Sequence, residues 1–403
     1  MKPEALHGRI NDLDSHEMIP TYLWPEIFGD AGVQLQSIEE QRSARGGANS
    51  YVTELRADRA EITEESVWNV KGVPAPGAFD LSRRTEVLDV MGIDRQLLFP
   101  GFGFLGLLLS SAGQDVAVDM YDLDPAKYDI PKLARTVVDA HNDWVLHRAQ
   151  LDERLIGVAL LAPEPTPKDF LSSARRLIEE GAQALWLPAA TPPGGVSPAD
   201  PALDDFWTMC VENDVVPLLH VGTEFSFPRT RVWSRVPAFA RAENHSLEFG
   251  LEPLAASTLH FAVENFLAAL TLGGVFERHP TLPFGVIECG AQWLGPFAER
   301  LDQWADQFQF RLQQSISTRP SDYLRRNVRV TPFHFETVDR FLDRHPSLID
   351  CYCYSSDYPH VEGGRDSAKR FFEIVEPFGD DTLEKFFVTN AQLIFSTSHS
   401  AGR

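Results

Sequence analysis

The chain has 403 residues, of which 43% are hydrophobic and 23% charged, so it can bury a large core and is not a disordered chain. Its formal net charge of −22 opposes binding to a nucleic-acid backbone or to an anionic membrane surface. The four cysteines lack the spacing of a zinc site, and we interpret them as small buried side chains. The longest apolar run, Phe102 to Leu109, is too short to span a bilayer, and Met1 to Ile10 does not resemble a signal peptide, which predicts a cytoplasmic protein.

Short apolar runs alternate with amphipathic helical stretches along the chain, as in βα units around a parallel sheet. The predicted strands are Ile10–His16, Gln96–Phe99, Leu155–Leu161, Ala184–Leu187, Val215–His220, Phe284–Glu288, Asn327–Thr331 and Ile349–Asp357. Apolar residues recur at spacings of three and four in the predicted helices Ala134–Gln150, Lys168–Glu180, Leu203–Asn213, Ala262–His279 and Trp293–Gln314. Eight strands with helices between them predict an α/β fold, a (β/α)8 TIM-like barrel that forms one domain over residues 1–403.

Three segments interrupt this alternation, at about residues 36–80, 113–131 and 223–257. Because loops of this length in a compact fold are usually functional or disordered, we expect these insertions to cap the carboxyl-terminal mouth of the barrel. Arg229 and Arg231 in the third insertion are candidates for holding an anionic group of a substrate. The alternative is that these two arginines belong to an ordinary solvated surface.

The first predicted strand carries three ionisable residues, Asp12, Asp14 and His16, at every second position. Residues two apart on a strand share one face, so all three side chains should point into the barrel. Burying such groups is costly unless they are paired or bind a metal, and carboxylates with imidazole form a common ligand set for zinc, manganese or iron. The alternative is a buried ion pair.

Ligand-type residues also stand at the ends of later predicted strands. His220 ends the fifth strand, Glu288 the sixth and Asp357 the eighth. Barrel enzymes keep their sites at the carboxyl ends of the strands, so these side chains should meet. Further candidates are His260, with Glu264 one helical turn away, and His334 and His360 after the last two strands. Each of these four is by itself more typical of a structural or substrate-facing residue.

Taken in order, these residues resemble a known family. The motifs are Asp14-x-His16 with Pro20, then His220, then Glu288-Cys289-Gly290-Ala291-Gln292-Trp293, then Ser356-Asp357-Tyr358-Pro359-His360. They resemble the amidohydrolase-related branch of the amidohydrolase superfamily. The resemblance implies a barrel in which Asp14, His16, His220 and Asp357 hold one divalent metal. The sequence departs from well-known members at Asp14, where they have His or Glu, and at Glu288, which is a histidine in many of the decarboxylases.

Glu288 changes the expected chemistry, because a glutamate beside a cation stays ionised and ligates it. Together with Asp12, Asp14 and Asp357 it supplies more negative charge than one divalent ion neutralises, which favours a second ion. A small group of amidohydrolase-related proteins, which use two iron ions or iron and manganese to activate dioxygen, resembles this chain in its acid-rich ligand set. The resemblance implies O2 as a second substrate.

We therefore expect a dinuclear nonheme iron monooxygenase that hydroxylates an aliphatic carbon of a hydrophobic, terpenoid-like acid or acyl thioester. In this hypothesis Glu288, Asp357 and His360 are catalytic. The metal ligands are Asp14, His16, His220, Glu288, Asp357 and His260, and the substrate contacts are His334, Arg229 and Arg231. The alternatives are a mononuclear zinc or manganese hydrolase or decarboxylase of a carboxylic acid, and a noncatalytic partner subunit. We expect a homodimer in either case.

Overall fold

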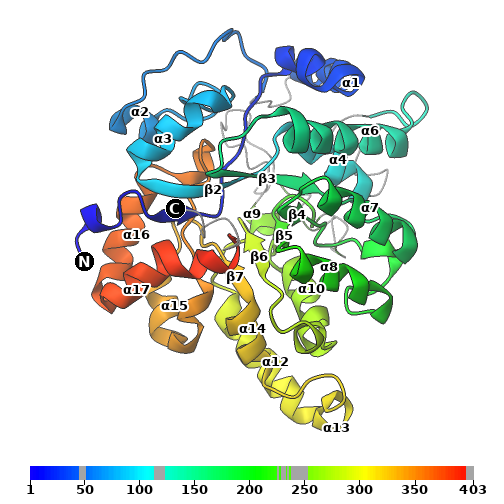
Figure 1. Ribbon diagram of the computed structural model, residues 1–403, viewed down its shortest axis with the longest axis vertical. Helices are drawn as coiled ribbons and strands as arrows, with labels where there is room; N and C mark the ends of the chain where they lie inside the picture. The colour runs from blue at the N-terminus through cyan, green and yellow to red at the C-terminus, as the bar shows by residue number, and fades with distance from the viewer. Residues whose placement is uncertain are drawn as a thin grey trace.

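The computed structural model describes residues 1–44, 51–112, 123–224, 227, 233, 236 and 253–395. Within these residues, seven parallel strands form one sheet in which each strand pairs with its predecessor in the chain (Figure 1). The strands are β1 (Ile10–Asp12), β2 (Ile93–Leu98), β3 (Leu155–Leu160), β4 (Ala184–Trp186), β5 (Val216–His220), β6 (Phe284–Ile287) and β7 (Val328–Val330). This sequential order is the one that βα units produce when they wind around a barrel.

An extended segment, residues 352–358, closes the sheet where an eighth strand was predicted. On one side the Cys353 N–H donates to the Val330 carbonyl of β7 at 2.9 Å. On the other side the Leu13 N–H donates to the Tyr354 carbonyl at 3.3 Å, and the His16 N–H donates to the Tyr358 carbonyl at 2.7 Å. The start of the predicted strand is wrong, because Pro346–Cys351 forms a 3-10 helix. The TIM-like barrel itself is confirmed.

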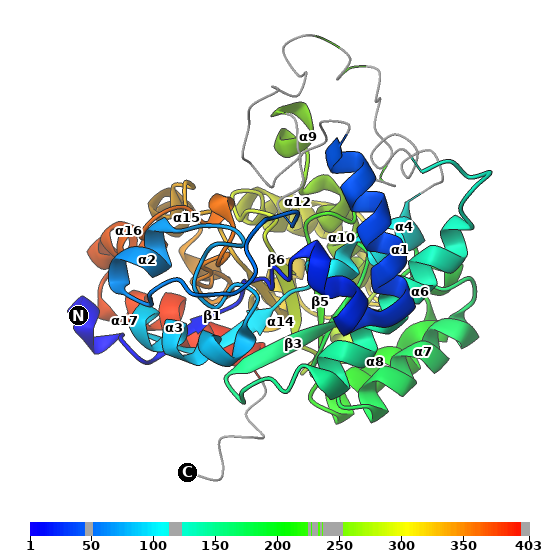
Figure 2. The same ribbon diagram turned by 90° about the horizontal axis from the view of Figure 1, so that it is seen from above.

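Helices surround the sheet, with α6, α7 and α8 on one side and α2, α3, α16 and α17 on the other (Figures 1 and 2). Their bounds are α1 (Trp24–Ala44), α2 (Glu64–Asn69), α3 (Arg84–Met91), α4 (Phe102–Ser111), α6 (Ile130–Asp143), α7 (Pro167–Glu179), α8 (Asp204–Glu212), α9 (Pro253–Ser257), α10 (Phe261–Leu272), α11 (Val275–Arg278), α12 (Leu294–Gln307), α13 (Gln309–Leu312), α14 (Pro320–Asn327), α15 (Val338–Arg344), α16 (Ser367–Val375) and α17 (Asp380–Glu384). The predicted helix Ala262–His279 is divided in two, because Gly274 adopts the left-handed backbone that ends α10 and precedes α11.

The predicted insertions are described only in part. The first contains the end of α1 and the whole of α2, so it is more helical than its composition indicated. Residues 113–122 of the second insertion and most of the third, including Arg229 and Arg231, lie outside the described residues. The expectation that these segments cap the barrel therefore stays a prediction.

Two apolar layers form the core. Inside the barrel, Trp186, Leu218 and Ile287 are fully or almost fully buried in one cluster. A larger cluster fills the space between the sheet and the surrounding helices. The four cysteines are buried and unbridged, as predicted.

One helical stretch, Pro253–Leu272 of α9 and α10, is long and apolar enough to cross a membrane by length and composition, with a mean hydropathy of 1.2. Val263, Phe266 and Leu270 on this stretch are buried in the core of the protein. A core helix passes the same test, so a single such stretch is weak evidence for a membrane span.

Candidate metal centre

Four buried side chains converge at the carboxyl ends of three strands. Asp14 and His16 follow β1, His220 ends β5 and Glu288 follows β6. Their ligand atoms all lie within 4.8 Å of one another. His220 Nε2 is 3.4 Å from Asp14 Oδ1 and 3.3 Å from Glu288 Oε2, and His16 Nε2 is 3.3 Å from Asp14 Oδ1. The structure thus places these four predicted ligands together.

A second group, formed by His16, Asp357 and His360, adjoins the first and shares His16 with it. Asp357 Oδ1 lies 3.4 Å from His16 Nε2 and 3.0 Å from His360 Nδ1. The two imidazole rings stack with their centroids 3.9 Å apart. His360 is therefore oriented by a carboxylate at one nitrogen and by a neighbouring ring on its face.

Glu288 and Asp357 share an unusual backbone conformation, each with φ of 51°. Few residues other than glycine adopt this left-handed region, because the Cβ atom is crowded there. Such residues cluster at functional sites, where the surrounding structure holds them in place. In this chain both lie near the carboxyl ends of the barrel segments, and their carboxylates reach the centre.

The chemistry of these donors fits a divalent metal ion. Asp14 Oδ2 and His16 Nε2 are buried and make no hydrogen bond within the described part of the chain. Burial, followed by the neighbouring His360, holds the pKa of His16 well below its usual value, so the imidazole is neutral and keeps a lone pair for a metal. A cation would also offset the cost of burying several carboxylates side by side.

Asp12 does not join these ligands, although it shares a strand with them. Its carboxylate accepts hydrogen bonds from the Ser356 hydroxyl at 2.6 Å, the Ser356 N–H at 2.8 Å and the Gln96 side-chain amide at 2.7 Å. Burial raises the pKa of Asp12 to about 7. Arg84, which is fully buried, extends this network by donating to Gln96 Oε1 and to the His16 carbonyl. Asp12 therefore has a structural partner set of its own.

The remaining predicted site residues lie apart from the centre or outside the described residues. His260 Nε2 is 3.5 Å from Glu264 Oε1, and Glu264 pairs with Arg300, so the structure does not bring His260 to either metal group. His334 is half-buried beside Gly364, and its pKa is lowered, chiefly by burial. Its predicted contact with a substrate stays a prediction, as does that of Arg229 and Arg231.

Sequence reasoning did not identify Ser356, Gln96 or Arg84. Ser356 could have been identified from the sequence, since it precedes Asp357 in a segment that was expected to face the barrel. Nothing in the sequence pointed to Arg84, because it lies 68 residues from His16, to whose carbonyl it donates a hydrogen bond. Hydrogen bonds between segments that far apart depend on the closed barrel, which only the folded chain shows.

A (β/α)8 barrel with buried carboxylates and imidazoles at the carboxyl ends of its strands defines a metal-dependent enzyme. The family model described as Amidohydrolase matches residues 114–396, more than half of the chain. The chain belongs to the amidohydrolase family.

Solved structures with the same fold cover nearly the whole chain. An amidohydrolase from Mycobacterium avium subsp. paratuberculosis is 19% identical with a TM-score of 0.65, over 96% of this chain and 99% of that one. The 2,6-dihydroxybenzoate decarboxylase from Rhizobium is 17% identical with a TM-score of 0.56, over 96% and 98%. The 5-carboxyvanillate decarboxylase from Novosphingobium aromaticivorans, complexed with manganese and 4-hydroxy-3-methoxy-5-nitrobenzoic acid, is 17% identical with a TM-score of 0.55, over 96% of both chains. A search of curated proteins found no match.

Proposed function

We propose that this protein is a decarboxylase of a carboxylic acid that depends on one divalent ion, zinc or manganese. The observation that carries the proposal is the buried group of Asp14, His16, His220 and Glu288 at the mouth of the barrel. The decarboxylases of the same fold, one of them complexed with manganese, support it.

The expected iron monooxygenase finds no support. The solved structures described above are an amidohydrolase and two decarboxylases, and the metal named among them is manganese. The group of Asp14, His16, His220 and Glu288 by itself supplies four ligands for one ion. The second group, His16, Asp357 and His360, is not needed to hold that ion. The mononuclear alternative therefore replaces the two iron ions and O2 of the sequence hypothesis.

The buried donors set the chemistry of the proposed site. When bound, the divalent ion would hold and polarise the carboxylate of the substrate. The imidazoles of His16 and His220 would supply nitrogen ligands, and Asp14 and Glu288 would supply negative charge. The barrel wall shields these residues from bulk solvent, since all four are at most 5% exposed.

Decarboxylation also needs a proton. When the bond to the leaving carbon dioxide breaks, its electron pair stays on the substrate carbon, which must then bind a proton. We assign this transfer to His360, because Asp357 Oδ1 accepts a hydrogen bond from its Nδ1 at 3.0 Å and the His360 side chain is 14% exposed at the edge of the centre. The carboxylate holds the ring in one orientation and stabilises its protonated form.

Hydrolysis is the second candidate function, and Glu288 favours it. A histidine can donate a proton near neutral pH, whereas an ionised glutamate beside a cation is suited to accept one from water. Glu288 Oε2 lies 3.3 Å from His220 Nε2 and 3.8 Å from His16 Nε2, so it faces the place where a reacting water would be held.

Substrate panels separate these functions. Manganese-loaded and zinc-loaded protein is incubated with hydroxylated benzoic acids, including 2,6-dihydroxybenzoate and 5-carboxyvanillate, and with simple esters and lactones. Release of carbon dioxide without oxygen uptake supports the proposal, and turnover of esters or lactones alone supports the second candidate. Asp357→Asn should be inactive, whereas Asp343→Asn, at an exposed position of α15, should match the wild type. Oxygen uptake coupled to product formation would overturn both functions.

A further inference from the structure

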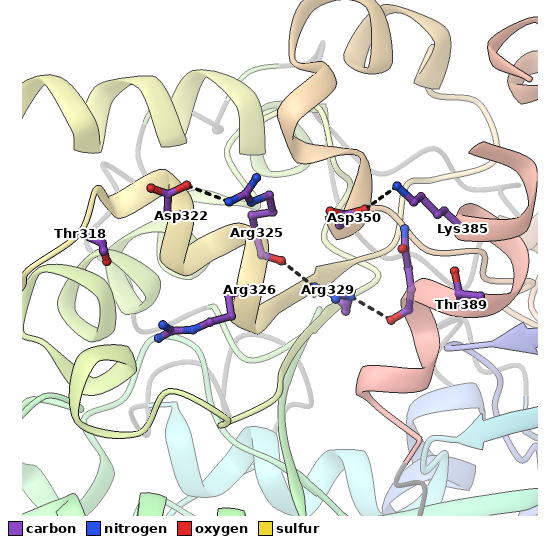
Figure 3. A pocket seen from close by; sticks show the side chains of 9 residues that line it. Thr318, Asp322, Arg325, Arg326, Arg329, Asp350, Lys385 and Thr389 are labelled. Atoms are coloured by element: carbon purple, nitrogen blue, oxygen red, sulfur yellow. Dashed lines mark hydrogen bonds and ion pairs between the residues drawn. The ribbon is translucent and has the colours of Figure 1, made fainter. Parts of the chain in front are cut away.

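A cavity of about 650 Å³ opens at the amino-terminal end of the barrel, away from the candidate metal centre (Figure 3). Residues of α14, the start of β7 and the segment 385–390 form it. Its ionisable lining consists of Arg325, Arg326, Arg329 and Lys385 with Asp322 and Asp350. Four cations against two carboxylates make this surface basic in a chain whose net charge is −22.

Two of the four cations have their own carboxylate. Arg325 Nη2 lies 3.1 Å from Asp322 Oδ1, and Lys385 Nζ lies 3.2 Å from Asp350 Oδ1, as the dashed lines in Figure 3 mark. These pairs account for both acidic residues of the lining. Lys385 Nζ also lies 3.3 Å from Asp381 Oδ2, which is outside the lining. Among the lining residues, the positive charge in excess therefore belongs to Arg326 and Arg329.

Of these two arginines, Arg329 is the buried one, with 9% of its surface exposed. Its Nε donates to the Asn390 carbonyl at 2.9 Å, and its Nη1 donates to the carbonyls of Arg325 and Val328 at 3.1 and 2.9 Å. Among the residues that the structure describes, no carboxylate lies within ion-pair distance of it. Carbonyl dipoles orient the guanidinium without neutralising it, and a buried charge is stable only when it is compensated.

Arg326 provides the second excess charge from the exposed side of the cavity. Its Nη2 donates to the Phe276 carbonyl and its Nε to Asn327 Oδ1, while its guanidinium lies 5.2 Å from the Tyr323 ring centroid. These contacts hold the side chain in place without a carboxylate within ion-pair distance in the described residues. Glu277, which accepts from the Tyr323 hydroxyl, interacts with Arg326 electrostatically from beyond ion-pair distance. Two ordered guanidinium groups without a direct carboxylate partner are suited to an oxyanion, which arginine binds through paired N–H groups.

We propose that this cavity binds a small molecule through its phosphate group, with Arg326 and Arg329 as the anion-binding residues. The cavity volume matches that of sites for small metabolites and exceeds the needs of a single ion. Since the cavity lies at the opposite end of the strands from the metal centre, the ligand does not compete with the substrate there.

The test is calorimetric titration of the full-length, metal-loaded protein with inorganic phosphate and with adenosine monophosphate, at constant ionic strength. We expect saturable binding that Arg326→Gln weakens by about tenfold, the effect of losing one charge-assisted contact. Arg329→Lys retains the charge and should weaken binding less if the protein remains folded. Arg344→Gln, at an exposed position of α15, is the matched control and should bind as the wild type does.

The two probes identify the source of the phosphate group. Tighter binding of the nucleotide than of phosphate indicates a phosphorylated metabolite, and equal binding indicates free phosphate. Binding of neither probe, or equal binding by the wild type and Arg326→Gln, would overturn the proposal. The titration measures ligand binding and not metal-dependent activity. Its result is therefore independent of the proposed function.

Discussion

Asp12 Oδ2 accepts a 2.6 Å hydrogen bond from the Ser356 hydroxyl, which joins residues 344 positions apart. The Ser356 N–H donates to the other carboxylate oxygen, and the neighbouring Asp357 N–H donates to the Asp14 carbonyl at 2.9 Å. The segment after β1 and the segment that closes the barrel are thus held together directly beside the metal centre. Asp14 and Asp357 depend on this connection for their relative positions.

Ser356→Ala should weaken metal binding although Ser356 is not a ligand. The change removes one donor to the buried Asp12 carboxylate, and residues that orient ligands typically contribute about 10-fold to 100-fold to metal affinity. We expect an increase in the manganese dissociation constant of about tenfold and a loss of about 1–3 kcal/mol in the free energy of unfolding. Ser82→Ala, which removes an exposed Ser–Asp hydrogen bond, is the control. Reduced stability with unchanged metal affinity would show that the Asp12 network supports the fold alone.

Glu288→Gln should reduce the affinity for the ion by at least about tenfold, because the amide retains the shape of the side chain and loses its charge. Metal content per chain after dialysis against a fixed free manganese concentration measures the effect. Glu373→Gln, at an exposed position of α16, should retain full occupancy. If Glu288→Gln binds as much manganese as the wild type with equal affinity, Glu288 is not a ligand.

His360→Gln should separate turnover from metal binding. Because His360 is assigned to proton transfer and not to the first ligand group, the variant should bind one ion with little change in affinity. Its kcat should fall by about 10²-fold to 10⁴-fold, the usual contribution of a general acid or base. The kcat is measured on the substrate that the panel identifies. A kcat within twofold of the wild type would remove His360 from the mechanism.

His141 should make the metal-free protein less stable in acid. It is buried in α6, where Nε2 contacts the Val158 carbonyl at 3.0 Å, and burial lowers its pKa to about 4 from 6.5. The unfolded chain therefore binds a proton below pH 6.5 that the folded chain does not bind until about pH 4. The contribution of His141 to the free energy of unfolding is therefore fully present above pH 6.5. It is lost as the pH falls from 6.5 to 4, and the loss is about 3 kcal/mol at most.

Urea unfolding of His141→Gln between pH 4 and pH 7 tests this assignment. The variant should show a shallower decrease in stability with falling pH than the wild type, while His147→Gln, an exposed substitution in the same region, should keep the wild-type slope. Equal slopes for His141→Gln and the wild type would show that His141 does not titrate between the two states.

The ligands of the centre could be predicted from the sequence because two local rules place them. Alternation along a strand put Asp14 and His16 on one face, and the ends of apolar runs marked His220 and Glu288. The same rules failed for Asp12, which obeys the alternation but pairs with Ser356 across the closed barrel. Local spacing also related His260 only to Glu264, one turn away, and carried no information on its distance from the centre.

The last strand was predicted too long for a physical reason. Leu348 and Ile349 continue the apolar pattern of the segment, yet Pro346 begins a 3-10 helix that ends only at Cys351. Arg329 is visible in the sequence as an unusual residue, since it is a charged residue between Val328 and Val330 in a buried strand. The cavity that surrounds Arg329 depends on segments distant in the chain.

The most direct test of the central claim is the number of metal ions per chain in protein reconstituted with manganese or zinc, measured together with activity before and after chelation. We predict one ion per chain in the wild type, less than about one-tenth of that in Asp14→Ala, and loss of activity on chelation that added manganese or zinc restores. Full activity in metal-free protein, or two iron ions per chain that are required for turnover, would contradict the account.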